Sequence, residues 1–212
     1  MENLSQFFEE HKKLVANRRE LSRNHYEVFE AYQKESDRSA AILASSFLEE
    51  ILGETIRSFF VEDQSVDDIF KGYSPLSTFS SKIDFAYALG LVTKEMKQDL
   101  DTIRKIRNHF AHNWKDVSFD TSPVSDFCRN LRITSRSFYN RLPDGKLVLN
   151  PAPRRLDQGV ILGSDVSVFS FKEQYLSAVS MLISSILHIF QCQVQERRVV
   201  PSFDYLGTQF DE

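Results

Sequence analysis

Apolar residues recur every three to four positions along most of this chain, the pattern of helices with one buried face. The periodicity predicts helices over residues 3–33, 36–60, 66–70, 78–89, 93–112 and 123–131, and a terminal helix that includes 174–195. Ser36 and Thr93 are the expected N-caps of two of them. Only seven glycines and six prolines occur among 212 residues, which favours long helices over a sandwich or a barrel. We therefore expect one domain over residues 1–212, an all-α bundle of about six to seven helices.

The helical pattern is interrupted over residues 137–170. Pro143-Asp144-Gly145 is a turn signal, and the short apolar runs 146–149 and 159–162 are typical of strands. The pattern predicts an insertion that carries a small β-hairpin embellishment near residues 145–165, with these two runs as its strands.

One arginine falls on an apolar stripe. Projected at about 100° per residue, Arg107 lies among the apolar residues of the 93–112 helix and its end. A guanidinium on a core-facing stripe is costly unless it is paired or faces a cleft. Glu50 and Glu54 lie at the edge of the buried face of the 36–60 helix, so we expect one of them to form a structural clamp with Arg107. The stripe comprises Met96, Leu100, Ile103, Ile106, Phe110 and Trp114.

The same helix also carries residues that could do chemistry. Asn108 and His112 are one helical turn apart on its flank. A histidine can act as general acid or base near neutral pH, and an arginine can hold a phosphate. However, Arg107 and His112 are five positions apart, which turns them about 140° away from each other on a regular helix. The spacing favours the clamp, with a catalytic site as the alternative.

Composition restricts the chemistry further. The two cysteines, Cys128 and Cys192, are far apart, and no Cys/His spacing typical of zinc is present. Neither a Gly-rich phosphate loop nor a catalytic serine motif occurs. We expect no cofactor, no metal and no disulfide framework.

Charge and hydropathy indicate whether the protein can bind nucleic acid or a membrane. The formal net charge is −4, so no broad basic field exists to hold a phosphate backbone. Direct DNA binding through Arg129, Arg132 and Arg136 is a further alternative, weakened by this acidity and by the lack of a helix-turn-helix pattern. Residues 174–195 lack formal charge, but their polar stripe indicates a packed helix and not a membrane span. The polar N-terminus predicts no signal peptide, and we expect a cytoplasmic protein.

Three segments carry a family resemblance. They are residues 34–50 (KESDRSAAILASSFLEE), 72–91 (GYSPLSTFSSKIDFAYALGL) and 103–112 (IRKIRNHFAH). Together they resemble the mannitol operon repressor family in order and spacing, over a family-like core of residues 34–132. The resemblance implies an all-helical regulator that has no recognised DNA-binding motif and acts through partners. The segment 137–170 departs from the family pattern.

A second, looser resemblance overlaps the third segment. Residues 107–112 are similar to the Arg-Asn-x-x-x-His signature of HEPN-type helical domains. Active members of that superfamily cleave RNA without metal, at sites formed where two copies of the helix meet across a dimer. The resemblance implies roles for Arg107, Asn108 and His112 if this protein is a ribonuclease or toxin.

The sequence therefore predicts a cytoplasmic transcriptional regulator or adaptor of the mannitol repressor type. It would act through protein contacts and not through direct DNA readout, and catalysis is not favoured. The alternative is an HEPN-type metal-independent ribonuclease or toxin, and only this alternative involves RNA. We expect an unidentified protein partner, a homodimer and no membrane association. The contact surfaces would be the 73–79 loop, the hairpin arm and the terminal helix, and the candidate binding residues are Tyr73, Leu76, Phe79, Arg107 and His112.

Overall fold

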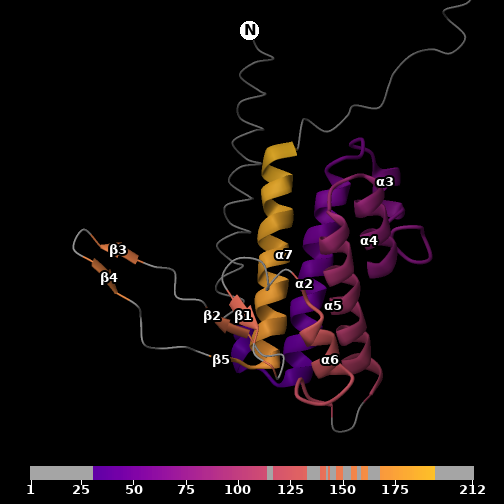
Figure 1. The fold of residues 1–212 in the computed structure, drawn as a ribbon. Helices are drawn as coiled ribbons and strands as arrows, with labels where there is room; N and C mark the ends of the chain where they lie inside the picture. The colour runs from indigo at the N-terminus through magenta and orange to yellow at the C-terminus, as the bar shows by residue number, and fades with distance from the viewer. Residues whose placement is uncertain are drawn as a thin grey trace, which may run out of the picture.

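The computed structural model describes residues 31–113, 117–132, 139–141, 143, 147–149, 154–156, 159–161 and 168–193. In these ranges the chain is mostly helical, as predicted (Figure 1). The helices are α2 (Asp37–Arg57), α3 (Gln64–Asp68), α4 (Phe79–Ala88), α5 (Lys94–His112), α6 (Val124–Arg129) and α7 (Phe171–Gln193). Of the helix predicted over residues 3–33, only 31–33 are described, and they are helical. None of the described helices is both long and apolar enough to cross a membrane.

Hydroxyl side chains set where the long helices begin. Ser36, Thr78 and Thr93 each accept a hydrogen bond from the backbone N–H three residues further on, at 3.1–3.2 Å. These bonds satisfy N–H groups that have no partner inside the helix. The C-terminus of α4 is also set locally. Gly90 follows this helix and adopts a φ of +72°, a backbone conformation that favours glycine.

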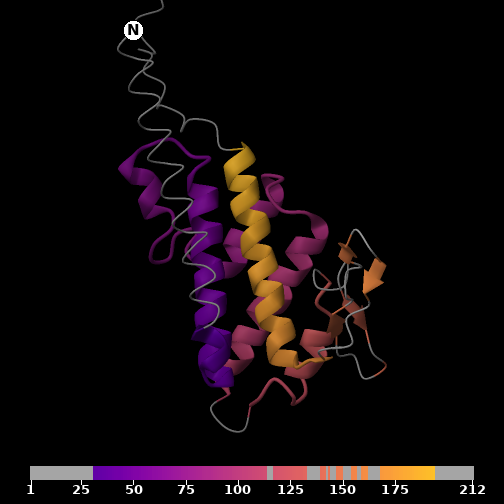
Figure 2. The same cartoon turned by 90° about the vertical axis from the view of Figure 1, so that its left-hand side faces the viewer.

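Helix α2 occupies the centre of the bundle. It packs against α4, α5 and most extensively α7, which runs beside it in both views (Figures 1 and 2). Its buried face is rich in small side chains, so the neighbouring helices approach closely. The phenol of Tyr175 on α7 donates a hydrogen bond of 2.8 Å to the carbonyl oxygen of Ala41. Burial raises the pKa of Tyr175, which keeps this donor protonated.

Aromatic rings close the end of the core where α5 finishes. Phe119, in the turn between α5 and α6, lies with its ring centroid 5.0 Å from that of Phe110 on α5. The same ring is 5.1 Å from that of Tyr175 on α7. All three side chains are buried, and the rings of each pair are tilted against each other, by 53° and 40°. This aromatic cluster joins α5, the turn and α7.

The strands differ from the prediction in their pairing. β2 (Leu147–Leu149) lies between β1 (Tyr139–Arg141) and β5 (Val168–Phe169) in an antiparallel sheet. β4 (Gly159–Ile161) pairs with β3 (Arg154–Leu156), which ends only two residues before it. The predicted hairpin, with 146–149 and 159–162 as its strands, is therefore wrong. Only two residues separate β3 from β4, and such a short connection favours this local pairing because it costs little chain entropy to close.

The small side chains of α2 generate a first prediction. Replacing Ala41 by leucine should lower the free energy of unfolding by about 1–3 kcal/mol, because a well-packed core resists added volume. The side chain of Ala41 is fully buried. Urea unfolding monitored by circular dichroism measures the change.

Leu43→Ala on the same helix is the matched control, because Leu43 is 44% exposed. The control should change stability much less. Equal effects of the two variants would contradict the proposed close packing of α2.

Candidate functional site

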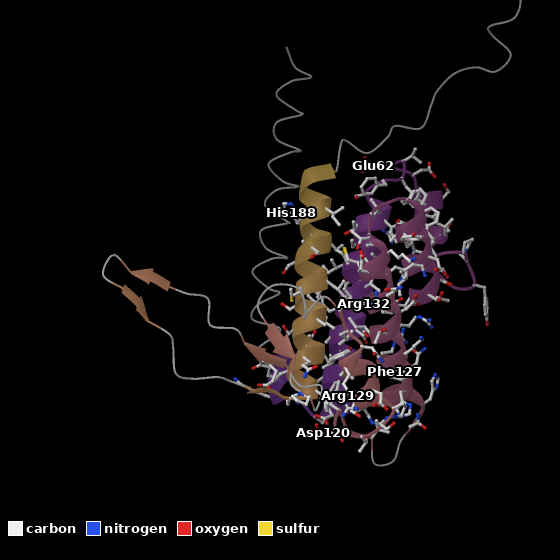
Figure 3. The ribbon with its side chains drawn as sticks, in the orientation of Figure 1. Glu62, Asp120, Phe127, Arg129, Arg132 and His188 are labelled. Atoms are coloured by element: carbon white, nitrogen blue, oxygen red, sulfur yellow. The ribbon has the colours of Figure 1, made fainter. Side chains whose placement is uncertain are left out.

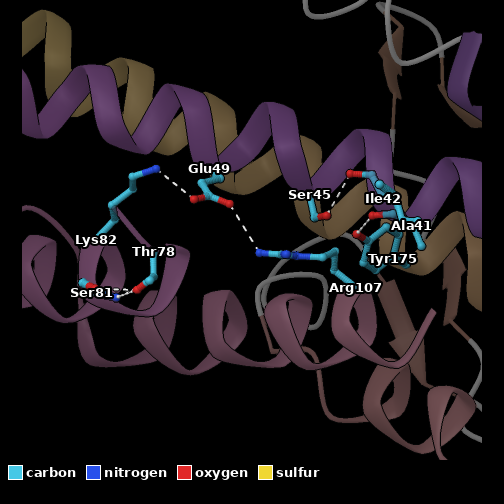
Figure 4. Close-up of polar contacts among 9 residues, drawn as sticks. All are labelled: Ala41, Ile42, Ser45, Glu49, Thr78, Ser81, Lys82, Arg107 and Tyr175. Carbon is cyan, nitrogen blue, oxygen red and sulfur yellow. Dashed lines mark hydrogen bonds and ion pairs between the residues drawn. The ribbon is translucent and has the colours of Figure 1, made fainter. Parts of the chain in front are cut away.

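Arg107 is held by a carboxylate of α2. Its Nη2 lies 3.4 Å from Oε2 of Glu49, and the two side chains are 30% and 22% exposed (Figure 4). We expected Glu50 or Glu54 to form this clamp, whereas the structure pairs Arg107 with Glu49 of the same helix. Glu50 and Glu54 are exposed, and Glu54 pairs instead with Arg57. Each residue turns the helix by about 100°, so Glu49 faces α5 while Glu50 points outward.

Glu49 also binds a third helix. Its Oε1 accepts a hydrogen bond of 2.8 Å from Nζ of Lys82 on α4. The aliphatic stem of Lys82 passes beside Gly53, where a Cβ would lie 3.7 Å from Cε. One carboxylate therefore joins α2, α4 and α5 through the network Lys82–Glu49–Arg107 (Figure 4).

Sequence reasoning did not identify Lys82 or Glu49 as functional residues, although both lie in segments that carry the family resemblance. Glu49 lies in segment 34–50, Lys82 in segment 72–91 and Arg107 in segment 103–112. These are the three segments that carry the family resemblance. The fold brings one charged residue from each of them into a single network.

The predicted binding residues of the 73–79 loop have different environments. Leu76 and Phe79 are 4% and 2% exposed, so they are core residues and cannot meet a partner directly. The guanidinium of Arg107 lies 6.0 Å from the ring centroid of Phe79, which places this ring under the ion network. Of the three predicted loop residues, Tyr73 alone presents its side chain to solvent.

The Arg-Asn-x-x-x-His residues do not converge within one subunit. Arg107 points toward α2, whereas His112 is exposed at the last position of α5. Asn108 between them is half-buried. Within the described ranges, no hydrogen bond or ion pair joins His112 to either residue. The side chains of Arg107 and His112 diverge because five positions on a regular helix turn them about 140° apart.

A residue that the sequence did not suggest holds the end of α5. The guanidinium of Arg38, in the first turn of α2, donates hydrogen bonds to the carbonyl oxygens of Phe110 and Asn113. Its neighbour Asp37 accepts a hydrogen bond of 3.1 Å from the backbone N–H of Phe119. Arginine is well suited to the carbonyl groups at a helix C-terminus, which carry partial negative charge. The start of α2 thus fixes the C-terminus of α5.

Two other buried groups have structural roles. Asp99 on α5 is buried, and its Oδ1 accepts a hydrogen bond of 2.9 Å from the backbone N–H of Arg132. Burial raises the pKa of the Cys128 thiol, so this cysteine stays protonated and is a poor nucleophile. Among the described residues, no group of three or more His, Cys, Asp or Glu side chains is placed to hold a metal ion.

The described residues form a helical bundle that also carries two small antiparallel sheets. A family model described as mannitol repressor (MtlR) matches residues 24–147, which is more than half of the chain. The chain therefore belongs to the mannitol repressor family. It is also similar to a chain in the X-ray structure of the MtlR–HPr complex from Escherichia coli, with a TM-score of 0.50 and 16% identity. That similarity covers 81% of this chain and 96% of the other, and it supports a shared fold. No curated protein matches the chain.

The network yields a second prediction. Glu49→Gln should lower the free energy of unfolding by about 1–3 kcal/mol, because it removes the anion that faces two partly buried cations. Arg107→Met should cost less, about 0–1 kcal/mol, because the pair is partly exposed and Lys82 keeps its partner. Chemical denaturation of both variants tests the order.

The neighbouring substitution Glu50→Gln is the matched control, since Glu50 is exposed on the same helix turn. It should leave stability nearly unchanged. A larger loss in Arg107→Met than in Glu49→Gln would show that the carboxylate is not the centre of the network.

Proposed function

We propose that this protein is a cytoplasmic transcriptional regulator of the mannitol repressor type, and that it acts by binding a protein partner. Family membership supports the regulatory role. The observation that carries the mode of action is the shared fold with a protein crystallised in the MtlR–HPr complex. We take HPr from this protein's own organism as the partner to test first.

The alternative of direct DNA readout has little support from the described residues. Helix α6 is only six residues long and ends at Arg129, so Arg132 lies beyond it. The guanidinium of Arg129 binds Asp126 at 2.6 Å and lies 4.9 Å from the ring centroid of Phe171. Arg136 is outside the described residues. A recognition helix needs several free side chains along one groove-facing side, and α6 is too short to supply them.

The ribonuclease alternative would need a second copy of the chain. Arg107 is paired and turned away from His112, so one subunit supplies no joint site for a phosphate and its acid or base. A homodimer that brings two α5 helices together could complete such a site. Homodimer formation itself stays a prediction, and light scattering in solution would measure it.

The partner proposal leads to a third prediction. Isothermal titration of the purified protein with HPr of its own organism should give saturable binding, with a dissociation constant in the micromolar range typical of a transient regulatory contact, about −8 kcal/mol. The same preparation should show no preference for its operator DNA over unrelated DNA. Tight operator binding by the protein alone, steeply weakened by salt, would overturn this mode of action.

A fourth prediction separates regulation from catalysis. In EDTA, wild type and His112→Ala should leave single-stranded RNA equally intact, because His112 and Arg107 diverge. Lys105→Ala, a change at an exposed position of the same helix, controls for lost surface charge. Cleavage by wild type and by Lys105→Ala, but not by His112→Ala, would instead establish the ribonuclease.

A further inference from the structure

The turn between α5 and α6 contributes a core side chain that belongs to no helix. Phe119 is 1% exposed, whereas the other residues of the turn, which spans 117–123, are half-buried or exposed. Its ring packs against the buried rings of Phe110 on α5 and Tyr175 on α7. A single side chain of the turn therefore covers the core at this end of the bundle.

One hydrogen bond ties the backbone of this turn to α2. The N–H of Phe119 donates to Oδ2 of Asp37, in the first turn of α2, at 3.1 Å. Every other hydrogen bond that the described structure gives to residues 117–123 stays within the turn or reaches the first turn of α6. The turn is therefore held in place by one carboxylate and by apolar packing.

The carboxylate of Asp37 is itself fixed by its surroundings. Its Oδ1 lies 3.7 Å from Nζ of Lys172, in the first turn of α7. The same ammonium group donates a hydrogen bond to the carbonyl oxygen of Glu35. A carboxylate in the first turn of a helix is also favoured by the helix dipole. These contacts leave Oδ2 directed toward the turn.

The next residue, Arg38, holds the end of α5. Its guanidinium donates hydrogen bonds to the carbonyl oxygens of Phe110 and Asn113. The N–H of Asn113 in turn donates a 3.1 Å hydrogen bond to the carbonyl oxygen of His109, at the C-cap of α5. Because the ring of Phe110 packs against that of Phe119, the end of α5 and the turn share one contact and have adjacent anchors on α2.

We propose that Asp37 and Arg38 form a latch that holds the end of α5 and the turn closed, and that both segments open as one unit when either anchor is lost. Loss of one anchor loosens the ring that it holds, and the contact between Phe110 and Phe119 passes this loosening to the other segment. Proteins open locally in such cooperative units, and the elements that move on binding are drawn from them. The latch therefore marks this end of the bundle as a place where the fold can change shape.

Hydrogen exchange of the full chain, followed by NMR for single amides, tests the latch. The amide of Phe119 reports on the turn, and that of Asn113 reports on the end of α5. Arg38→Met should speed exchange at Phe119 about tenfold or more, although no described hydrogen bond joins Arg38 to the turn. Asp37→Ala should speed exchange at Asn113 by a similar factor, although Asp37 binds the turn and not α5.

Two exposed charged residues supply the control variants. Asp120→Ala removes an acid from the turn itself, and Lys105→Ala removes a base from α5. Asp120 lies at the end of the bundle opposite Glu62 (Figure 3). Neither control should change exchange at Phe119 or Asn113 by more than about twofold, because neither side chain belongs to the latch.

A conservative variant separates the hydrogen bond from a general loss of stability. In Asp37→Asn the amide oxygen can still accept the N–H of Phe119, so exchange at both reporters should be slower than in Asp37→Ala. The amide of Leu48, in the middle of α2, should exchange more slowly than both reporters in every variant, because the opening is local.

The outcomes decide the proposal. Faster exchange at the remote reporter in both Arg38→Met and Asp37→Ala, with Leu48 still slow, supports the latch. If each variant speeds exchange only at the amide whose own contacts it removes, the two anchors act independently and the latch is wrong. If Leu48 exchanges as fast as the reporters, the whole bundle unfolds together and no separate unit exists.

Discussion

The close contact made possible by the small side chains of α2 is the constraint on which the rest of the bundle depends. Ala41, Ala44 and Ser45 are buried where larger residues would hold the neighbouring helices apart. Because α7 approaches so closely, the phenol of Tyr175 reaches the α2 backbone. On the other side of α2, the carboxylate of Glu49 is near enough to reach two helices at once. The polar contacts of α2 therefore depend on the close packing of its neighbouring helices.

Polar contacts then give α2 distinct connections along its length. At its start, Asp37 and Arg38 bind backbone groups at and beyond the end of α5. In its middle, Glu49 binds Lys82 and Arg107. Ion pairs that are partly open to water add little stability, but each fixes which helix faces meet. This explains how a modest number of charges can specify one arrangement of an otherwise apolar bundle.

Features that depend on neighbouring residues were predicted well from the sequence, whereas contacts between distant segments were not. The caps at Ser36 and Thr93 and the helices that follow them depend on neighbouring residues, so the sequence was sufficient. Periodicity identified the helix that binds Arg107, but it could not distinguish Glu49 from the adjacent Glu50. Leu76, predicted at a binding surface, is 4% exposed and belongs to the hydrophobic core, which its place in a loop sequence did not indicate. The pattern marked residues 146–149 and 159–162 as strands, but it does not contain the information about which strands pair.

A shared counter-ion has an evolutionary consequence. Lys82 and Arg107 lie on different helices, and both depend on the single carboxylate of Glu49. A relative that loses the acid at this position keeps two cations beside each other unless both change as well. Sequences of the family that lose the acid at position 49 should therefore also differ at positions 82 and 107. Such linked variation would record the three-helix contact even in relatives too distant for the rest of the core to be aligned.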